Sequence, residues 1–430
     1  MTPGAANLPW YRQVNREQWR AFLACWGGWV LDGFDFTILT FILIDIQQEF
    51  TVTSAAAGLL GTVTMLTRMV GGVAAGTAAD RWGRKGPLMV SILWFSLFAM
   101  LCGFSTSYAM LFTFRALFGI GMGGEWAAAM PLALEHWPAH LRGIASGILQ
   151  AGFSTGFMVS AFVFQFLYPL FEGAPGLGWR AMFWIGVLPA LLVLWIRKGV
   201  AESPVWLERQ RHLAETERRD EVSILRILKP DMIGVTLQTS LLMGAFIFSY
   251  HSTAFWYPTF LRESGLQPFA FLVALNGGAI VGSVIWGRVS ESRAGRRGAA
   301  TMGALLAIVM IPLYLMVEAP GLLLVGALLM GIGGPGMWGI IPTYLSERFP
   351  TATRGVGPGF AYHAGAALGA FTPALIGSLR DRGMALPTAM ALFIVVSMTL
   401  AMVMLRLGPE TRGKRFEALD DGVPQVAEAV

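Results

Sequence analysis

Two carboxylate residues interrupt an apolar stretch near the start of the sequence. Residues 28–44 read GWVLDGFDFTILTFILI, and Asp32 and Asp35 lie in the middle of this run. Each carboxylate costs about 2.5–3.5 kcal/mol at the centre of a lipid bilayer. Because the two are three residues apart, we expect them on one face of a helix. A buried carboxyl group can bind and release a proton near neutral pH, so Asp32 or Asp35 is predicted to couple to protons.

An arginine and a glutamate occupy the later apolar run 109–133. The guanidinium of Arg115 can bind a substrate carboxylate with two parallel hydrogen bonds, or form a permanent ion pair with one of the aspartates. Glu125 lies ten residues further, about 15 Å along a helix. It is predicted as a second proton site, with pairing to Arg68 or Arg142 as the alternative.

The remaining candidate binding residues lie in the second half of the chain. His251 and His363 lie within apolar runs, and an imidazole can titrate near neutral pH. Tyr250, Tyr257 and Asn276 are predicted to line a substrate cavity with them. The alternative is structural: a hydrogen-bonded histidine, and aromatic rings that pack or anchor at the membrane interface.

The composition indicates a membrane protein. Of the 430 residues, 55% are hydrophobic and 13% are charged, against about 25% charged in soluble domains. No removable signal peptide is expected, since no short apolar segment precedes a small-residue cleavage site. Cys25 and Cys102 both lie in apolar runs, so neither a disulfide framework nor a metal site is predicted.

The apolar runs predict an all-α membrane protein with twelve transmembrane helices in two six-helix bundles. A span needs about 20 mostly apolar residues. The spans are expected near 21–44, 55–79, 87–107, 109–133, 143–167, 179–197, 231–260, 268–290, 299–318, 321–345, 356–379 and 386–406. The predicted domains are an N-terminal segment 1–20, a first bundle 21–197, a central loop 198–230, a second bundle 231–406 and a tail 407–430.

The basic residues predict the orientation. All but six of the 31 lysines and arginines fall at the N-terminus, in alternate connections, in the central loop or in the tail. Loops rich in Lys and Arg stay in the cytoplasm. Both termini and the central loop are therefore expected in the cytoplasm, with the protein in the cytoplasmic (inner) membrane. The net charge of +5 follows this topology and does not indicate nucleic-acid binding.

The two halves resemble each other at an offset of about 211–212 residues. Three landmarks recur in order: GTAADRWGRKG as GRVSESRAGRRG, GIGMGGEW as GIGGPGMW, and PLALEHWPAHLRG as PTYLSERFPTATRG. The pattern indicates a duplicated six-helix unit, an arrangement in which a substrate lies between the halves near the middle of the membrane.

The charged loop copies are predicted to form a conformational gate that stabilises one access state. Its predicted members are Gly76, Asp80, Arg81, Gly83, Arg84, Lys85, Arg142, Glu291, Arg296 and Arg297.

Two glycine patterns imitate a nucleotide-binding motif. Residues 119–124 and 331–336 both satisfy G-x-G-x-x-G. A dinucleotide site needs this motif between a strand and a helix, whereas both copies lie inside apolar helical runs. We interpret the glycines as points of close helix approach. No phosphate-binding loop and no catalytic constellation occurs, so no enzyme activity, cofactor or nucleotide is predicted.

Several motifs resemble a known family. GTAADRWGRKG is similar to the loop signature of the major facilitator superfamily, and RALFGIGMGG resembles its Arg-containing fourth-helix motif. AESPVWL and GPETRG resemble the motifs that end its two halves. The opening NLPWYRQVNREQWRAFLACWGGWVLDGFDF resembles the sialate:proton symporters, a family that also holds lactate and pyruvate permeases.

This resemblance implies a monomeric transporter that imports a small organic acid, sialic acid or a lactate- or pyruvate-type monocarboxylate, together with protons. An aromatic-acid:proton symporter is the first alternative, since D-G-[FY]-D also suits that family. A carrier without proton coupling and a carboxylate sensor that does not transport remain open. The expected partners are the organic anion, protons and the bilayer, with no nucleic acid and no nucleotide.

Overall fold

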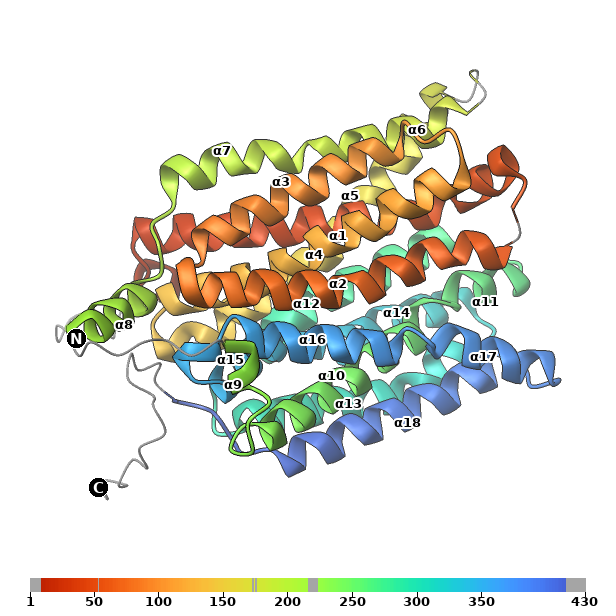
Figure 1. The fold of residues 1–430 in the computed structure, drawn as a ribbon. Coiled ribbons are helices and arrows are strands. Elements are labelled where there is room, and N and C mark those ends of the chain that lie inside the picture. Colours follow the sequence, from red (N-terminus) through yellow and green to blue (C-terminus); the bar gives the residue numbers. More distant parts are fainter. Residues whose placement is uncertain (1–8, 53, 172–173, 175, 216–222, 415–430) are drawn as a thin grey trace.

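The fold is a bundle of long helices that run alongside one another (Figure 1). The computed structural model describes residues 9–52, 54–171, 174, 176–215 and 223–414, and within these residues it contains no strand. The helices of the first half are α1 (Arg16–Phe50), α2 (Ser54–Trp82), α3 (Lys85–Cys102), α4 (Tyr108–His136), α5 (Arg142–Leu167), α6 (Leu177–Trp184) and α7 (Pro189–Gly199). The prediction of an all-α protein is confirmed.

The second half follows a short helical connection, α8 (Pro204–Glu215) and α9 (Ser223–Arg226). Its helices are α10 (Ile233–Ala254), α11 (Tyr257–Glu263), α12 (Pro268–Val289), α13 (Gly295–Leu315), α14 (Pro320–Gly333), α15 (Ile341–Arg348), α16 (Val356–Gly369), α17 (Thr372–Asp381) and α18 (Leu386–Leu407). A 3₁₀ turn, η6 (Pro335–Ile340), joins α14 to α15. Parts of the predicted N-terminal segment, central loop and tail (1–8, 216–222 and 415–430) lie outside the described residues.

Within the described residues, eleven helical stretches are long and apolar enough to cross a membrane. The span predicted at 356–379 is present as two consecutive helices, α16 and α17. Proline at position 373 has no N–H to donate to the Gly369 carbonyl four residues earlier, so the helical ladder is interrupted there. The Thr372 hydroxyl donates to that carbonyl instead, at 2.7 Å.

The two halves meet along two helix pairs, α2 with α16 and α5 with α12. In the sequence repeat, α2 corresponds to α12 and α5 to α16, so the two pairs are equivalent contacts of a pseudo-symmetric molecule. We call this surface between the halves the seam.

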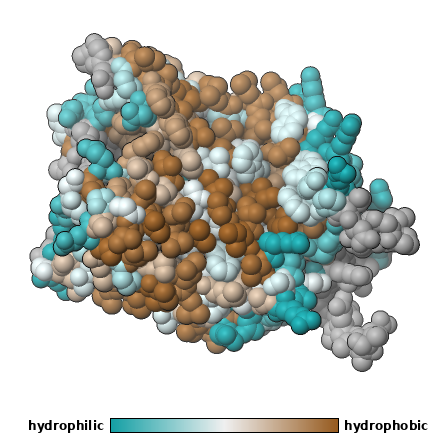
Figure 2. Space-filling view, turned by 180° about the vertical axis from the view of Figure 1, so that it is seen from behind, coloured by the Kyte–Doolittle hydropathy of each residue, from teal (hydrophilic) through white to brown (hydrophobic). Residues whose placement is uncertain are grey.

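The surface fits a lipid environment. On the face shown in Figure 2, apolar side chains form a broad band across the middle of the molecule, with hydrophilic side chains gathered toward both ends. Leu191, Leu194 and Val309 are among the large apolar side chains at the surface, each more than 60% exposed. Such a belt would be a liability in water, whereas in a bilayer it contacts acyl chains.

The glycines of α4 hold neighbouring helices close, as predicted for the G-x-G-x-x-G pattern. A side chain at Gly121 would lie 2.7 Å from the backbone nitrogen of Phe95 on α3, and Gly119 is equally tight against the backbone of α2 at Thr64. These glycines lie inside a continuous helix, so they form no phosphate-binding turn.

Candidate functional site

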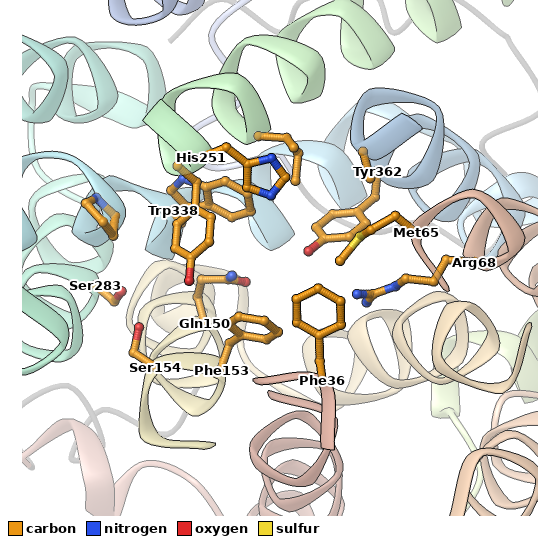
Figure 3. Close-up of a pocket in the computed structure, with 14 residues that line it drawn as sticks. Phe36, Met65, Arg68, Gln150, Phe153, Ser154, His251, Ser283, Trp338 and Tyr362 are labelled. Carbon is orange, nitrogen blue, oxygen red and sulfur yellow. The ribbon is translucent and has the colours of Figure 1, made fainter. Parts of the chain in front are cut away.

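A cavity lies between the two halves, and Figure 3 shows the residues that line it. Helices α1, α2 and α5 contribute one wall, and α10, α12, η6 and α16 contribute the other. The lining residues are Phe36, Met65, Arg68, Gln150, Phe153, Ser154, Ile247, Tyr250, His251, Ser283, Pro335, Trp338, Tyr362 and Ala366. This is the midplane position that the sequence repeat predicts for a substrate.

Five aromatic rings dominate the lining, those of Phe36, Phe153, Tyr250, Trp338 and Tyr362. Four of them form a chain of edge-to-face contacts that crosses the seam. The centroid distances are 6.5 Å for Phe153–Tyr250, 5.8 Å for Tyr250–Trp338 and 6.5 Å for Trp338–Tyr362. A flat apolar or aromatic molecule fits such walls, since aromatic faces and edges pair at these distances.

Arg68 is the one arginine or lysine among these lining residues. Its side chain is 2% exposed, and Nη2 donates to Oδ2 of Asp32 at 3.2 Å. Its guanidinium carbon lies 5.9 Å from the centre of the Tyr362 ring. Nε of Arg68 and Oδ1 of Asp32 are buried and have no hydrogen-bond partner in the described part of the chain. The pair therefore keeps capacity for a further partner.

Glu125 completes this group, which we call the Arg68 cluster (Asp32, Arg68 and Glu125). Glu125 is fully buried, and neither carboxylate oxygen has a hydrogen-bond partner among the described residues. A side chain at Gly28 on α1 would lie 2.6 Å from Oε1, so the carboxyl group has just enough room beside α1. The cluster holds two carboxyl groups and one guanidinium. Because an unpaired buried carboxylate is costly, this arrangement is favourable when one carboxyl group carries a proton.

Asp35 and Arg115 lie apart from the cavity, inside the first half. Arg115 is the cation that acts on Asp35, yet no direct ion pair joins them within the described residues. Oδ2 of Asp35 and both Nε and Nη2 of Arg115 are buried without partners there, and the guanidinium lies 4.4 Å from the Phe118 ring centre. Asp32 and Asp35, predicted to share one face, thus meet different cations. Arg115, predicted to bind substrate, is not a lining residue.

Among the other predicted binding residues, His251 and Tyr250 line the cavity. Nδ1 of His251 lies 3.1 Å from the Gly369 carbonyl. A carbonyl can only accept, so Nδ1 carries a hydrogen. The carbonyl that Pro373 leaves without its helical donor therefore orients the His251 ring.

His363, Tyr257 and Asn276 are not among the residues that line the cavity. Nε2 of His363 donates to the Gly123 carbonyl across the seam at 3.1 Å. Tyr257 stacks on Tyr314 with ring centres 4.2 Å apart, and Asn276 Nδ2 donates to the carbonyl of Leu272 on its own helix. These contacts are structural, and their predicted roles with substrate stay predictions.

The predicted gate residues gather at the end of the bundle that carries the α2–α3 turn. The Asp80 carboxylate pairs with Arg84 and accepts the backbone N–H groups of Gly355, at 2.8 Å, and Val356, at 3.0 Å. These two groups open α16, so an acid of the first half caps a helix of the second half. Anionic groups stabilise helix N-termini through their free N–H groups and their dipole.

Glu135 of α4 adds a second link across the seam. It lies 3.4 Å from Arg84 and 3.2 Å from Arg354 of the second half. Burial alone would lower the pKa of the Arg84 guanidinium, but the carboxylates of Glu135 and Asp80 outweigh burial and hold that pKa above its usual value.

The second sequence copy repeats this arrangement. Arg296 pairs with Glu291 at 2.9 Å and with Glu347 at 3.0 Å, while Glu291 accepts the backbone N–H of Gly143 at the start of α5. The Thr343 hydroxyl donates to the Arg142 carbonyl at 2.9 Å. We call the two copies together the seam lock: Asp80, Arg84, Glu135 and Arg354, with Glu291, Arg296, Glu347 and Arg142.

The other predicted gate residues shape the two turns. Gly83 and Gly295 adopt φ values of +96° and +70°, a region that glycine occupies without strain. Lys85 Nζ donates to the Arg197 carbonyl at 3.0 Å. The Arg81 guanidinium lies over the Trp82 ring, and Nη2 of Arg297 donates to the Arg406 carbonyl. Gly76 lies close to the backbone of Val356.

Sequence reasoning did not single out several residues that the structure brings to these sites. For the seam lock, the repeat contained the signal, since Glu135 and Glu347 occupy matched positions of the third landmark, as do Arg142 and Arg354. For the cavity, Gln150 had no such signal, because its second-half counterpart is not glutamine, whereas Arg68 was expected only as an alternative partner of Glu125.

Comparison with known proteins agrees with this geometry. The family model for the Major Facilitator Superfamily matches residues 25–373. A probable 4-methylmuconolactone transporter of Cupriavidus pinatubonensis is 31% identical, over 96% of this chain and 95% of that protein. The sialic acid transporter NanX of Escherichia coli is also 31% identical, over 95% and 98%. The proton:xylose symporter XylE has a similar fold, with a TM-score of 0.76 at 19% identity over 94% of this chain and 98% of that one.

Proposed function

The chain belongs to the Major Facilitator Superfamily and is therefore a multi-pass membrane transport protein and not an enzyme, and from this premise we propose that it imports a small organic-acid anion together with protons. The observation that carries the proposal is Arg68. A buried guanidinium that lines the cavity is suited to a carboxylate.

The lining supports an aromatic or unsaturated monocarboxylate as the substrate. Five rings surround one guanidinium, so a flat acid would contact apolar surface along its body and Arg68 at its carboxylate. Sialic acid, with many hydroxyl groups, would place several of them against rings without hydrogen-bond partners.

The Arg68 cluster supports proton coupling through competition for one cation. A substrate carboxylate that binds Arg68 loosens its pairing with Asp32, and an uncompensated carboxylate in this buried position takes up a proton. The substrate and the proton then move as a neutral pair. Glu125, which shares the same cation, is the second group that can hold the proton.

The seam lock supports a proposal for the conformational state of the transporter and for its orientation in the membrane. Ion pairs and helix caps tie the halves together at the end that carries the α2–α3 turn. The loops rich in Lys and Arg also lie at this end, so by the positive-inside rule it faces the cytoplasm. The structure then corresponds to a form closed toward the cytoplasm.

The test uses the purified chain in liposomes that contain a pH-sensitive dye, with an imposed proton gradient. We expect labelled benzoate to accumulate and to acidify the liposome lumen, both above the level in protein-free liposomes, and labelled lactate and N-acetylneuraminate to accumulate at least about tenfold less. Arg68→Gln should abolish binding and uptake, since a buried charge-assisted hydrogen bond contributes about 1.5–3 kcal/mol and its loss also leaves Asp32 unpaired.

Arg180→Gln is the matched control, because Arg180 forms an ion pair with Glu49 far from the cavity and is partly exposed. It should retain uptake. Accumulation of benzoate that persists in Arg68→Gln would rule out the carboxylate site, and uptake without any proton movement would rule out symport.

A further inference from the structure

Three polar side chains of the cavity have hydrogen-bonding groups without protein partners. Gln150 and Ser154 lie on α5 and Ser283 lies on α12, and all three line the cavity. Gln150 is 6% exposed and Ser283 is 2% exposed, so both are effectively buried. No hydrogen bond from the described residues reaches the Gln150 amide or either hydroxyl, and these polar atoms are not sealed from the cavity space.

Some other hydroxyl groups in these helices donate to a backbone carbonyl of their own helix. The Thr155 hydroxyl, next in sequence to Ser154, donates to the Ala151 carbonyl at 2.8 Å. Ser252 on α10 does the same to Phe248 at 2.7 Å. Such bonds to the carbonyl four residues earlier satisfy Ser and Thr side chains inside a helix. Ser154 and Ser283 make no such bond, so their donors remain available to a ligand.

The three side chains form one patch on the side of the cavity away from Arg68. Gln150 and Ser154 are four residues apart, which places them on one face of α5. Ser283 reaches the same region from α12, the helix that packs on α5 across the seam. In Figure 3 the patch lies opposite Arg68, with the rings of Phe36 and Phe153 between them. We call Gln150, Ser154 and Ser283 the amide–hydroxyl patch.

The patch is neutral. Apart from tyrosines, Arg68 and His251 are the ionisable groups in the described lining, and His251 commits Nδ1 to the Gly369 carbonyl. A second carboxylate at the patch would find no cation to pair with, and an unpaired buried charge is costly. A hydroxyl, carbonyl or amide group would instead satisfy both the ligand and the free protein groups.

We propose that the amide–hydroxyl patch is a second subsite, which binds a neutral hydrogen-bonding substituent at the end of the substrate opposite its carboxylate. The preferred ligand is then an aromatic or unsaturated monocarboxylate that carries a hydroxyl or carbonyl group at its far end. Dicarboxylates are excluded by the missing second cation. This inference rests on the proposed function, because it takes Arg68 as the carboxylate site.

The test measures dissociation constants of the purified full chain for benzoate, 3-hydroxybenzoate, 4-hydroxybenzoate and terephthalate. We expect at least one hydroxybenzoate to bind about tenfold more tightly than benzoate, and terephthalate to bind more weakly than benzoate. In Gln150→Leu and in Ser283→Ala, the affinity for that hydroxybenzoate should fall to the level of benzoate. The affinity should fall more for that hydroxybenzoate than for benzoate, a loss of preference that a general folding defect would not reproduce.

Ser252→Ala is the matched control, since it removes a buried hydroxyl of α10 that does not line the cavity. It should leave all four constants unchanged. Equal binding of benzoate and both hydroxybenzoates by the unmodified chain would overturn the subsite while leaving the proposed function intact. Failure to bind any of these acids, by contrast, would overturn the proposed function.

If Gln150→Leu does not fold, Ser154→Ala and Ser283→Ala carry the same test with a smaller change. Loss of hydroxybenzoate preference in either one supports the subsite. Retention of the full preference in both overturns it.

Discussion

At the scale of single residues, one guanidinium serves two carboxyl groups. Arg68 donates to Asp32 and is a cation that acts on Glu125, which has no hydrogen-bond partner in the described structure. Three ionised groups in this buried place would carry a net negative charge, and a single proton removes it. We propose that the number of protons bound by the cluster depends on which other group binds Arg68.

Glu125→Gln tests this link. Glutamine matches the shape of a protonated glutamate but releases no proton, so we expect benzoate exchange between the two sides of a liposome to continue while accumulation driven by a proton gradient is lost. Counterflow and gradient-driven uptake, measured in the same preparation, check this. Glu49→Gln, at an exposed ion pair, should change neither. A Glu125→Gln variant that accumulates benzoate like the unmodified chain would remove Glu125 from the coupling mechanism.

At the scale of the elements, the break between α16 and α17 positions a cavity residue. Proline 373 leaves the Gly369 carbonyl without a helical donor, and that carbonyl accepts from Thr372 and from His251. A proline in an apolar helix is tolerated where a neighbouring side chain satisfies the freed carbonyl. The hydrogen bond from His251 satisfies the Gly369 carbonyl and also fixes the orientation of the His251 ring toward the cavity.

Two substitutions of His251 separate these effects. Asparagine can place its amide N–H near the position of Nδ1, whereas leucine leaves the Gly369 carbonyl with Thr372 alone. We expect His251→Leu to lower the free energy of unfolding by about 1 kcal/mol, and His251→Asn to lower it by less than half as much. Thermal unfolding in detergent measures both. Equal destabilisation by the two variants would show that the hydrogen bond to Gly369 does not stabilise the fold.

At the scale of the whole molecule, the two halves are joined by copies of one charged arrangement. Asp80 caps α16 from across the seam, and Glu291 does the same for α5. Separating the halves at this end would break both copies. We propose that the seam lock contributes to the free-energy difference between the form closed at this end and the form open at it.

Asp80→Asn should shift this balance toward the open form. It removes the charge that pairs with Arg84 and weakens the bonds to Gly355 and Val356, a change of about 1.5–3 kcal/mol, or roughly 10- to 100-fold in the equilibrium. The readout is maleimide labelling of Ser346→Cys, a buried position at this end whose hydroxyl has no partner in the described residues. Cys25 and Cys102 are first replaced by alanine.

We expect labelling at least about tenfold faster with Asp80→Asn, as the shift in equilibrium requires. Glu49→Gln, an acid of an ion pair at the opposite end, is the control and should leave the rate unchanged. An unchanged rate in Asp80→Asn would mean that the seam lock does not hold this end closed.

The sequence alone predicted the all-α architecture, the repeat and the presence of costly charges, because each depends on local properties of the chain. Hydropathy over about 20 residues specifies a span, and a helical period specifies which neighbours share a face. The landmarks at an offset of about 211–212 specified which loops would form equivalent contacts, and the structure pairs Arg84 and Arg296 with matched acids.

Only the tertiary structure decided which charges face the cavity. Arg68 and Arg115 are both single arginines in apolar helices, and nothing in their local sequence distinguishes them. The rotation of each helix about its own axis, determined by glycine contacts and by the seam, turns Arg68 toward the cavity and leaves Arg115 inside the first half. The same packing gives Asp32 and Asp35 different cations and brings Gln150 and Ser154 beside Ser283. Such relations join residues far apart in the chain, so they arise only when the helices pack.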